Sequence, residues 1–402
     1  MIGSIRLLRE RIVAASGSAL SSILLVAFFV YVGMSMIWSV LAVYASALGA
    51  TTSFVGILIA CFGGIRLVSN MPAGLAYERF GRRPTMLAGL LLLAIGSWPV
   101  LIWPNLPVLF ISMVIQGLGS AIYATSAIAT VGDMSNKESR VRDMAAFQAI
   151  LMTGMSVGPA IGGVLAAGLG YSAPFLLQSI VAMLGTLALF RVPPGRGGSR
   201  KARAGLQWSL MRQISGPVIM TFTSYFCRIA GTWVLMPLVA KDQLGMGLWA
   251  VGLLLTVSAI TNIVVLPLVT WVADRFGRRA LLLLSGVSII SSLLLLSLYA
   301  TPVTIWIVSI LSGLGGGFAG AVLSAYVADA APPGQMGPAM GILRMATDIG
   351  FIVGPIAVGA VSDGLGLGYQ GGLALSIVLM MGGTIFCWRQ TRGLPDGKPR
   401  AA

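Results

Sequence analysis

The chain has 402 residues, of which 57% are hydrophobic and only 9% are charged, and its mean hydropathy is +0.94. A soluble domain carries about 25% charged residues, so this chain lacks the polar side chains that a water-exposed surface needs. The composition excludes a water-soluble fold and predicts an integral membrane protein.

The net charge of +15 does not indicate a nucleic-acid partner, because the basic residues lie in short connectors between apolar runs rather than on one folded face. The chain has no histidine, which excludes imidazole catalysis and a histidine-ligated metal. Its three cysteines lie far apart in apolar runs without a Cys-x-x-Cys spacing, so we expect no disulfide framework, no metal site and no cofactor.

Apolar runs of about 20 residues, the length that a helix needs to cross a bilayer, recur along the whole chain. The first run follows Arg6, Arg9 and Arg11 and is too long for a cleavable signal peptide. Backbone groups in lipid must hydrogen-bond within their own segment, so each run is expected to be a helix. The twelve spans are predicted near 21–45, 54–76, 84–103, 106–131, 144–168, 172–191, 215–240, 248–272, 279–300, 303–328, 338–362 and 370–389.

The basic residues of the connectors fall almost entirely on one side of the predicted membrane, and the connectors of the other side hold only Lys241. By the positive-inside rule, the basic side is cytoplasmic. We therefore predict a multi-pass protein of the plasma (cell inner) membrane with both termini in the cytoplasm.

A Gly- and Pro-rich basic linker at 192–214 separates two groups of six spans, residues 1–191 and 215–402. The two groups are repeats, because one offset of 196 positions aligns many short motifs, such as Gly117-Leu118-Gly119 with Gly313-Leu314-Gly315. Two parallel halves imply a pseudo-twofold axis along the membrane normal and a central cavity. The predicted fold is an all-α membrane protein with twelve transmembrane helices in two six-helix halves.

A short basic turn, Arg-Phe-Gly-Arg-Arg, occurs between spans two and three and returns unchanged between spans eight and nine. Glycine permits a tight turn, and an acid beside the arginines can bond the neighbouring half when this side of the protein closes. The alternative interpretation is a plain topology signal. The candidate gating residues are Gly74, Glu78, Arg79, Gly81, Arg82, Arg83, Asp274, Arg275, Gly277, Arg278 and Arg279.

Span five carries a second motif of small residues, and span eleven repeats part of it. Small residues let two helices pack closely, and proline kinks a span. The segment from Gly154 to Gly158 also matches a hydrolase nucleophile elbow, but the chain has no histidine base, so we predict no enzyme activity. The motif residues are Gly154, Gly158, Pro159, Gly162, Gly163, Gly350, Gly354 and Pro355.

Four charged side chains lie within predicted spans, where each costs about 2.5–3.5 kcal/mol on insertion scales. Arg344 and Asp348 stand four residues apart in span eleven, so they share one helix face and can pair. Asp348 is the only acid well inside a span, which makes it the candidate proton carrier; the alternative is a static pair with Arg344. Arg66 and Arg228 have no evident acidic partner and can attract an anionic group of a substrate.

These motifs resemble those of a twelve-span member of the major facilitator superfamily over essentially the whole chain. In that family the loop between spans two and three reads G-x-x-x-D-R-x-G-R-R. This chain matches the loop except that Glu78 replaces the Asp, and in the second copy Thr270 replaces the first Gly. The span-five motif is found mostly in the exporter branches of the family, so the resemblance favours export.

The resemblance also implies that spans one, four, seven and ten line the central cavity. The substrate-contact candidates on this basis are Tyr31, Ser35, Trp38, Gln116, Tyr123, Tyr225, Trp233 and Tyr326. Drug–proton antiporters of the family usually carry an arginine three residues before the Gln-Gly of span four, where this chain has Met113. Span one also lacks the acidic residue that many of them carry, so the usual coupling residues are missing.

We therefore predict a secondary transporter that exports small amphipathic compounds or metabolites by a rocker-switch cycle, with proton antiport as the default driving force. The alternative is an organic-anion transporter or importer that recognises its substrate through Arg66, Arg228 and Arg344. The expected partners are a small-molecule substrate, protons and membrane lipid. We expect no nucleic-acid partner and a monomeric protein.

Overall fold

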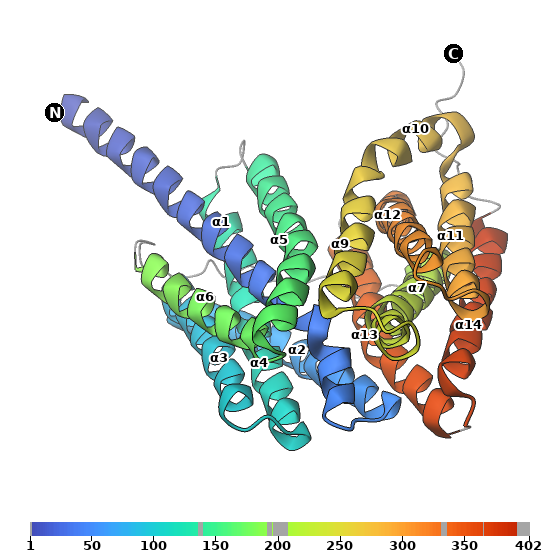
Figure 1. The fold of residues 1–402 in the computed structure, drawn as a ribbon. Coiled ribbons are helices and arrows are strands. Elements are labelled where there is room, and N and C mark those ends of the chain that lie inside the picture. The colour runs from blue at the N-terminus through green and yellow to red at the C-terminus, as the bar shows by residue number, and fades with distance from the viewer. Residues whose placement is uncertain are drawn as a thin grey trace, which may run out of the picture.

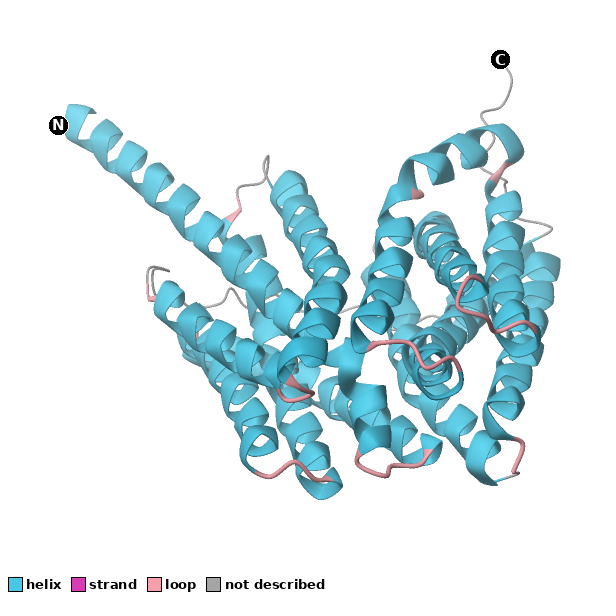
Figure 2. Ribbon diagram, in the orientation of Figure 1, coloured by secondary structure: helices cyan, strands magenta, loops and turns pink. Residues whose placement is uncertain are grey.

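The computed structural model of the protein describes residues 2–135, 140–190, 195, 208–330, 336–364 and 366–391. Within these ranges the regular structure is helical and contains no strand (Figure 2). In chain order the elements are α1 (Ile2–Ala47), α2 (Thr52–Phe80), α3 (Arg82–Ile102), α4 (Leu106–Met134), α5 (Arg140–Leu169), α6 (Ala173–Leu189), α7 (Trp208–Cys227), η1 (Arg228–Leu235), α8 (Met236–Leu238), η2 (Val239–Gln243), α9 (Leu248–Val264), α10 (Leu266–Phe276), α11 (Arg278–Leu298), α12 (Thr304–Ala330), α13 (Met336–Gly364) and α14 (Gly368–Gln390).

The described helices account for the twelve predicted spans. Ten helical stretches are long and apolar enough to cross a membrane, and the bent pair α9–α10 makes an eleventh. The twelfth is α6, whose 17 apolar residues give a length of roughly 26 Å at 1.5 Å per residue. The first helix begins at Ile2, well before the predicted span, and Leu20–Ala47 within it is long and apolar enough to cross a membrane.

Two spans that the sequence predicts as continuous helices are interrupted. The eighth bends by 41° between α9 and α10, next to Pro267, which has no N–H to continue the helical hydrogen-bond ladder. The seventh contains the π-helical segments η1 and η2, which flank the short helix α8 and its Pro237. Short π-helical insertions are frequent at functional sites, and η1 begins at a predicted site residue, Arg228.

The duplicated basic turn has the same backbone in both halves. Gly81 is the single residue between α2 and α3, and Gly277 is the single residue between α10 and α11. Their φ angles are 85° and 83°, in a region that glycine adopts without steric penalty. The N–H of Gly81 donates to the carbonyl of Tyr77, 2.9 Å away, and so ends α2.

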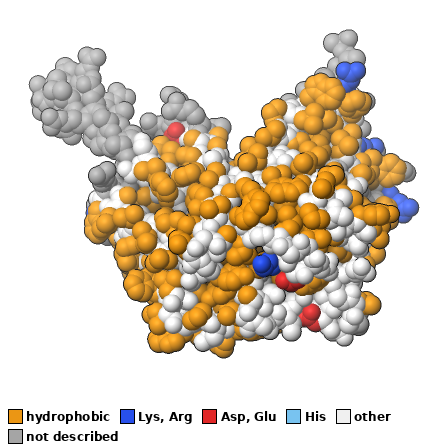
Figure 3. Space-filling view, in the orientation of Figure 1, with side chains coloured by type: hydrophobic (Ala, Val, Ile, Leu, Met, Phe, Trp, Pro, Cys, Tyr) orange, Lys and Arg blue, Asp and Glu red, His pale blue; other side chains and the backbone are white. Residues whose placement is uncertain are grey.

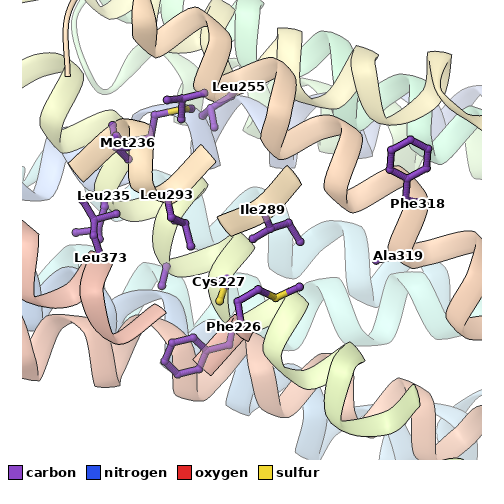
Figure 4. Packing of buried hydrophobic residues seen from close by; sticks show 14 of the residues in the cluster. Phe226, Cys227, Leu235, Met236, Leu255, Ile289, Leu293, Phe318, Ala319 and Leu373 are labelled. Carbon is purple, nitrogen blue, oxygen red and sulfur yellow. The ribbon is translucent and has the colours of Figure 1, made fainter. Parts of the chain in front are cut away.

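The helices form two groups that meet along a narrow interface (Figure 1). Within the first group, α1 packs on α5 and α6, and α4 packs on α2 and α3; the second group repeats this pattern with α7, α9 and α11–α14. Each group has its own buried apolar core. Figure 4 shows part of the second core, where Phe226 and Cys227 of α7 lie near Ile289 and Leu293 of α11. The predicted linker 192–214 lies mostly outside the described residues, so the boundary between the halves stays a prediction.

The two halves touch at one end of the molecule and separate at the other. We call the end that holds the α2–α3 and α10–α11 turns the basic end, and its opposite the far end. Contacts between the halves are made by α2 with α13 and by α5 with α9, and the close ones lie toward the far end. Toward the basic end the ribbons diverge (Figure 1) and the surface is hollowed between the halves (Figure 3).

Candidate functional site

The small residues of α5 and α13 bring these helices close to a neighbour in their own half. A Cβ on Gly154 would fall 2.9 Å from the carbonyl oxygen of Phe28 in α1, and one on the equivalent Gly350 would fall 2.6 Å from that of Phe222 in α7. Such distances leave no room for a side chain. The same packing faces continue through Gly158, Gly162 and Gly354.

Two helix crossings join the halves, and the 196-residue repeat relates them to each other. At the first crossing, between α2 and α13, Gly56 lies against the backbone carbonyl of Pro355. At the second crossing, between α5 and α9, Gly252 lies against the carbonyl of Pro159, and a Cβ on Gly163 would fall 2.9 Å from the Cα of Gly252. Both crossings are therefore backbone-to-backbone contacts that only glycine permits.

One ion pair connects the halves at the first crossing. The Nη2 of Arg66 donates to the Oδ1 of Asp348 at 2.9 Å, and the Asp348 side chain is only 6% exposed. The guanidinium also lies 5.7 Å from the ring centroid of Phe351. The predicted Arg344–Asp348 pair is therefore wrong, and so is the prediction that Arg66 has no acidic partner. Both errors arise because the crossing of α2 with α13, rather than spacing along one helix, decides which charges meet.

An aromatic cluster fills the interface on the far-end side of this ion pair. Trp38 of α1 packs edge-on against Phe62 of α2 and Phe351 of α13, with ring centroids 4.8 and 5.7 Å apart, and it also contacts Trp233 of η1 at 5.7 Å. Trp38 is 8% exposed. Aromatic rings in such arrangements fill space tightly, so the cluster closes the passage between the halves toward the far end.

A pocket of about 200 Å³ lies in the second half, among α7, η1, α11, α12 and α13. It contains three of the predicted substrate residues, Tyr225, Arg228 and Arg344, together with Thr347. Among the described residues that line it, none is acidic. Arg344 is exposed, whereas Arg228 is half-buried at the start of the π-helical segment.

Other predicted contact residues pack inside the first half instead of lining this pocket. Gln116 is buried and donates from Nε2 to the Oγ of Ser112 at 2.9 Å. Ser35 donates to the carbonyl of Gly154 at 3.1 Å, and Tyr123 is 1% exposed. In the second half, Tyr326 is also buried. Tyr31 of α1 lies within electrostatic reach of Arg66 and Arg344, and Trp38 of α1 lines a second, small pocket together with Arg228.

The candidate gating residues surround the open basic end. Glu78, Arg79 and Arg275 are exposed, and the guanidinium of Arg83 lies over the ring of Phe190 in its own half, 4.5 Å from the centroid. The side chain of Asp274 is outside the described part of the chain. The remaining candidates of this group are Gly74, Gly81, Arg82, Gly277, Arg278 and Arg279, and their gating role stays a prediction.

Sequence analysis missed a second polar contact between the halves. The backbone N–H of Ser53 donates to the Oδ2 of Asp363 at 2.6 Å. Ser53 lies in the first turn of α2, where amides have no partner within the helix, so a carboxylate of α13 caps a helix of the other half. The only signal in the sequence is an isolated acid at the end of span eleven.

A bundle of twelve apolar helices in two repeated halves, open at one end and holding a charged pocket inside the membrane-spanning region, defines a multi-pass membrane transporter. A family model described as the Major Facilitator Superfamily matches residues 23–226 and 218–402. The chain belongs to the Major Facilitator Superfamily, whose members are transporters and not enzymes. This confirms both the predicted family and the predicted fold class.

Curated relatives include proteins named for drug resistance. The chain is 25% identical over 346 residues to Multidrug resistance protein 1 of Bacillus subtilis (strain 168), covering 84% of this chain and 87% of that protein. It is 26% identical over 157 residues to Quinolone resistance protein NorA of Staphylococcus aureus (strain Mu50), covering 39% of this chain and 40% of that protein.

Solved structures with the same fold include two transporters at 13% identity. One is a bacterial homolog of the human lysosomal transporter Spinster in an inward-facing and unoccupied conformation, with a TM-score of 0.76 over 94% of this chain and 97% of that chain. The other is the nucleoside transporter NupG, with a TM-score of 0.76 over 93% of this chain and 98% of that chain. At this identity the likeness concerns the fold alone.

Proposed function

We propose that this transporter works by alternating access and moves small amphipathic compounds or metabolites out of the cytoplasm. The observation that carries the proposal is the pair of glycine crossings, which hold the halves together near the far end while the basic end is open. The basic end faces the cytoplasm by the positive-inside rule, so the conformation described here loads substrate from inside. The protein is a monomer in the plasma (cell inner) membrane, with both termini cytoplasmic.

The names of the relatives support export over import. Multidrug resistance protein 1 and Quinolone resistance protein NorA are named for resistance, which a cell can gain by moving a compound outward. The glycine motif of α5 also supports export, because it resembles a motif of the exporter branches of the family. The alternative is an organic-anion importer, which would use the same fold. A transport assay that measures movement in both directions distinguishes the importer from the exporter.

The register of α2 on α13 predicts the closed form of the basic end. Arg66 faces Asp348 across the first crossing, and about two helical turns further toward the basic end stand Gly74 and Gly341. A Cβ on either glycine meets no atom within 4 Å in the open form. When the halves rock together, these two glycines come face to face and form a contact like that of the far end.

The duplicated basic turns stabilise this closed form. Arg79 and Glu78 end α2 next to Gly74, and they are exposed while the basic end is open. On closure they approach the second half, where charge-assisted hydrogen bonds to helix ends contribute about 1.5–3 kcal/mol each. Gating contacts of this kind form in one conformation only, which is what alternating access requires.

Asp348 is the proposed proton carrier of an antiport cycle. Arg66 pairs with Asp348 while the first crossing is intact, and Arg344 stands one turn before Asp348 on the same helix. In this cycle the carboxylate exchanges Arg66 for a proton when the far end opens and regains Arg66 when the crossing re-forms, so return to the loading conformation carries a proton inward.

Cysteine cross-linking tests the alternating-access cycle without knowledge of the substrate. In a background without the three native cysteines, Gly74→Cys with Gly341→Cys should form a disulfide upon oxidation whenever the basic end closes, and Arg79→Ala should lower its yield. The matched control is Gly64→Cys with Gly341→Cys, because Gly64 has equally open surroundings but lies about 15 Å from Gly74 along the helix. Absence of the Gly74–Gly341 disulfide at every pH would contradict the proposed closure.

A further inference from the structure

We infer that the pocket of the second half is an oxyanion site, and that the transported amphipathic compound is an organic anion such as a carboxylate. This inference rests on the proposed function, because it names the chemical class of the substrate. In this inference Arg228 and Arg344 bind the anion, and Arg66 does not contact it.

The charge balance around the pocket is the first reason. Arg66 is neutralised by Asp348 at 2.9 Å, whereas in the described part of the chain no carboxylate lines the pocket that holds Arg228 and Arg344. Two positive charges inside a membrane-spanning bundle are costly unless they are paired. An anionic ligand that enters from the open basic end supplies the missing partner. Guanidinium groups are well suited to it, because they bind a carboxylate through two parallel hydrogen bonds.

The polar groups beside the arginines are the second reason. The hydroxyl of Ser224, on the pocket wall, is buried and has no hydrogen-bond partner among the described residues. The same holds for the amide Nδ2 of Asn262, which lies beside Gly316 of the pocket wall and is not itself a lining residue. Gly316 makes room for both Asn262 and Arg228, since a Cβ there would fall 2.6 Å from the Asn262 Nδ2 and 3.4 Å from the Arg228 Nη1. Unused donors beside two guanidinium groups match a ligand that only accepts hydrogen bonds.

The first half explains why the anion is amphipathic. The 196-residue repeat pairs the α7 positions Thr221, Ser224, Tyr225 and Arg228 with positions of α1 that are all apolar. Those positions are Leu25, Phe28, Phe29 and Val32. Pseudo-symmetry turns the two helices toward the same central space, so one wall offers hydrogen-bond donors and positive charge while the other offers apolar surface. A molecule with an oxyanion at one end and an apolar body complements both walls.

Equilibrium binding tests the inference independently of transport. Protein in phosphatidylcholine nanodiscs is titrated with radiolabelled 4-phenylbutyrate and, separately, with the neutral 4-phenylbutanamide and the cationic 4-phenylbutylamine. The carboxylate should bind at least about tenfold more tightly than the other two, because charge-assisted hydrogen bonds account for that difference. Arg228→Gln and Arg344→Gln should each remove the preference. Arg389→Gln is the matched control, because it removes the same positive charge from an exposed arginine of α14 that lies outside the pocket.

The outcomes distinguish failure of the oxyanion site from failure of the proposed function. Equal or tighter binding of the amine or the amide would overturn the inference, as would unchanged carboxylate affinity in both pocket variants with a normal Arg389→Gln protein. Competition by phosphatidylglycerol that both pocket variants abolish would keep the oxyanion site and identify a lipid headgroup as the source of the anion. Anion binding without movement of any of the three compounds or of other solutes in proteoliposomes would contradict the proposed function and leave the site intact. Export of cations alone would contradict the oxyanion site and leave the proposed function intact.

Discussion

The two crossings that join the halves have the same backbone contacts but different polar contacts. Gly56 meets the carbonyl of Pro355 at the first crossing, and Gly252 meets that of Pro159 at the second. These four residues are equivalent under the 196-residue repeat. Because both crossings depend on close approach of glycine to backbone, they can act together as a hinge about which the halves rock.

Among the described residues, the ion pair and the carboxylate cap between the halves belong to the first crossing. The equivalents of Arg66 and Asp348 at the second crossing are Asn262 and Met152, which cannot form an ion pair. Likewise, the equivalents of Ser53 and Asp363 are Trp249 and Ala167, so no carboxylate caps α9 there. The difference teaches that a duplicated hinge can become a switch when one copy gains charges: the second crossing is a plain pivot, while the first carries the proposed proton switch.

The shared glycines should produce the largest effect when they are changed. Gly56→Leu and Gly252→Leu each force backbone apart at a crossing, which costs about 3 kcal/mol or about a hundredfold in the population open at the basic end. The population is measured as the distance between nitroxide labels on cysteines at Ala88 and Leu284, which are exposed and equivalent in the two halves. Gly64→Leu, whose surroundings are open, should change nothing. A large effect at one crossing and none at the other would disprove a shared hinge.

Loss of the ion pair should produce a smaller effect, and this effect should be confined to the first crossing. Asp348→Asn removes a charge-assisted hydrogen bond between the halves, so the population open at the basic end should fall about tenfold or more. Met152→Asn places the same asparagine side chain at the equivalent position of the second crossing. It should leave the population open at the basic end near that of the wild type. Equal effects of the two substitutions would show that charge does not distinguish the crossings. The same pair of labels reports both.

The helix cap of Asp363 should contribute least. Asp363→Asn keeps the shape of the side chain but weakens its interaction with the first turn of α2 by about 0.5–1 kcal/mol, which corresponds to a few-fold loss of the same population. Ala167→Asp installs a carboxylate at the equivalent position, near the start of α9, whose N-cap Gly247 makes no side-chain hydrogen bond. It should raise the population by a similar factor. A decrease in that variant would refute the capping explanation.

Much of this architecture is readable in the sequence, because spans and repeats are local patterns. The glycines of both crossings and the paired basic turns follow from one offset of 196 positions. The partner of Asp348 does not follow, since it depends on how a helix of one half lies across a helix of the other. The same holds for the contact of Asp363 with Ser53. The break at Pro267 was overlooked because proline inside a long apolar run is common in membrane helices.

The measurement that tests the central claim most directly is the distance between labels at Ala88 and Leu284 as the pH is lowered, in the wild type and in Asp348→Asn. In the proposed cycle a proton replaces Arg66 as the partner of the Asp348 carboxylate, so the form open at the basic end loses its ion pair between the halves when that proton binds. We predict that this distance shortens as the pH falls in the wild type and does not depend on pH in Asp348→Asn. A pH-independent wild type, or an identical pH response in the variant, would contradict the assignment of the first crossing as the proton-sensitive switch.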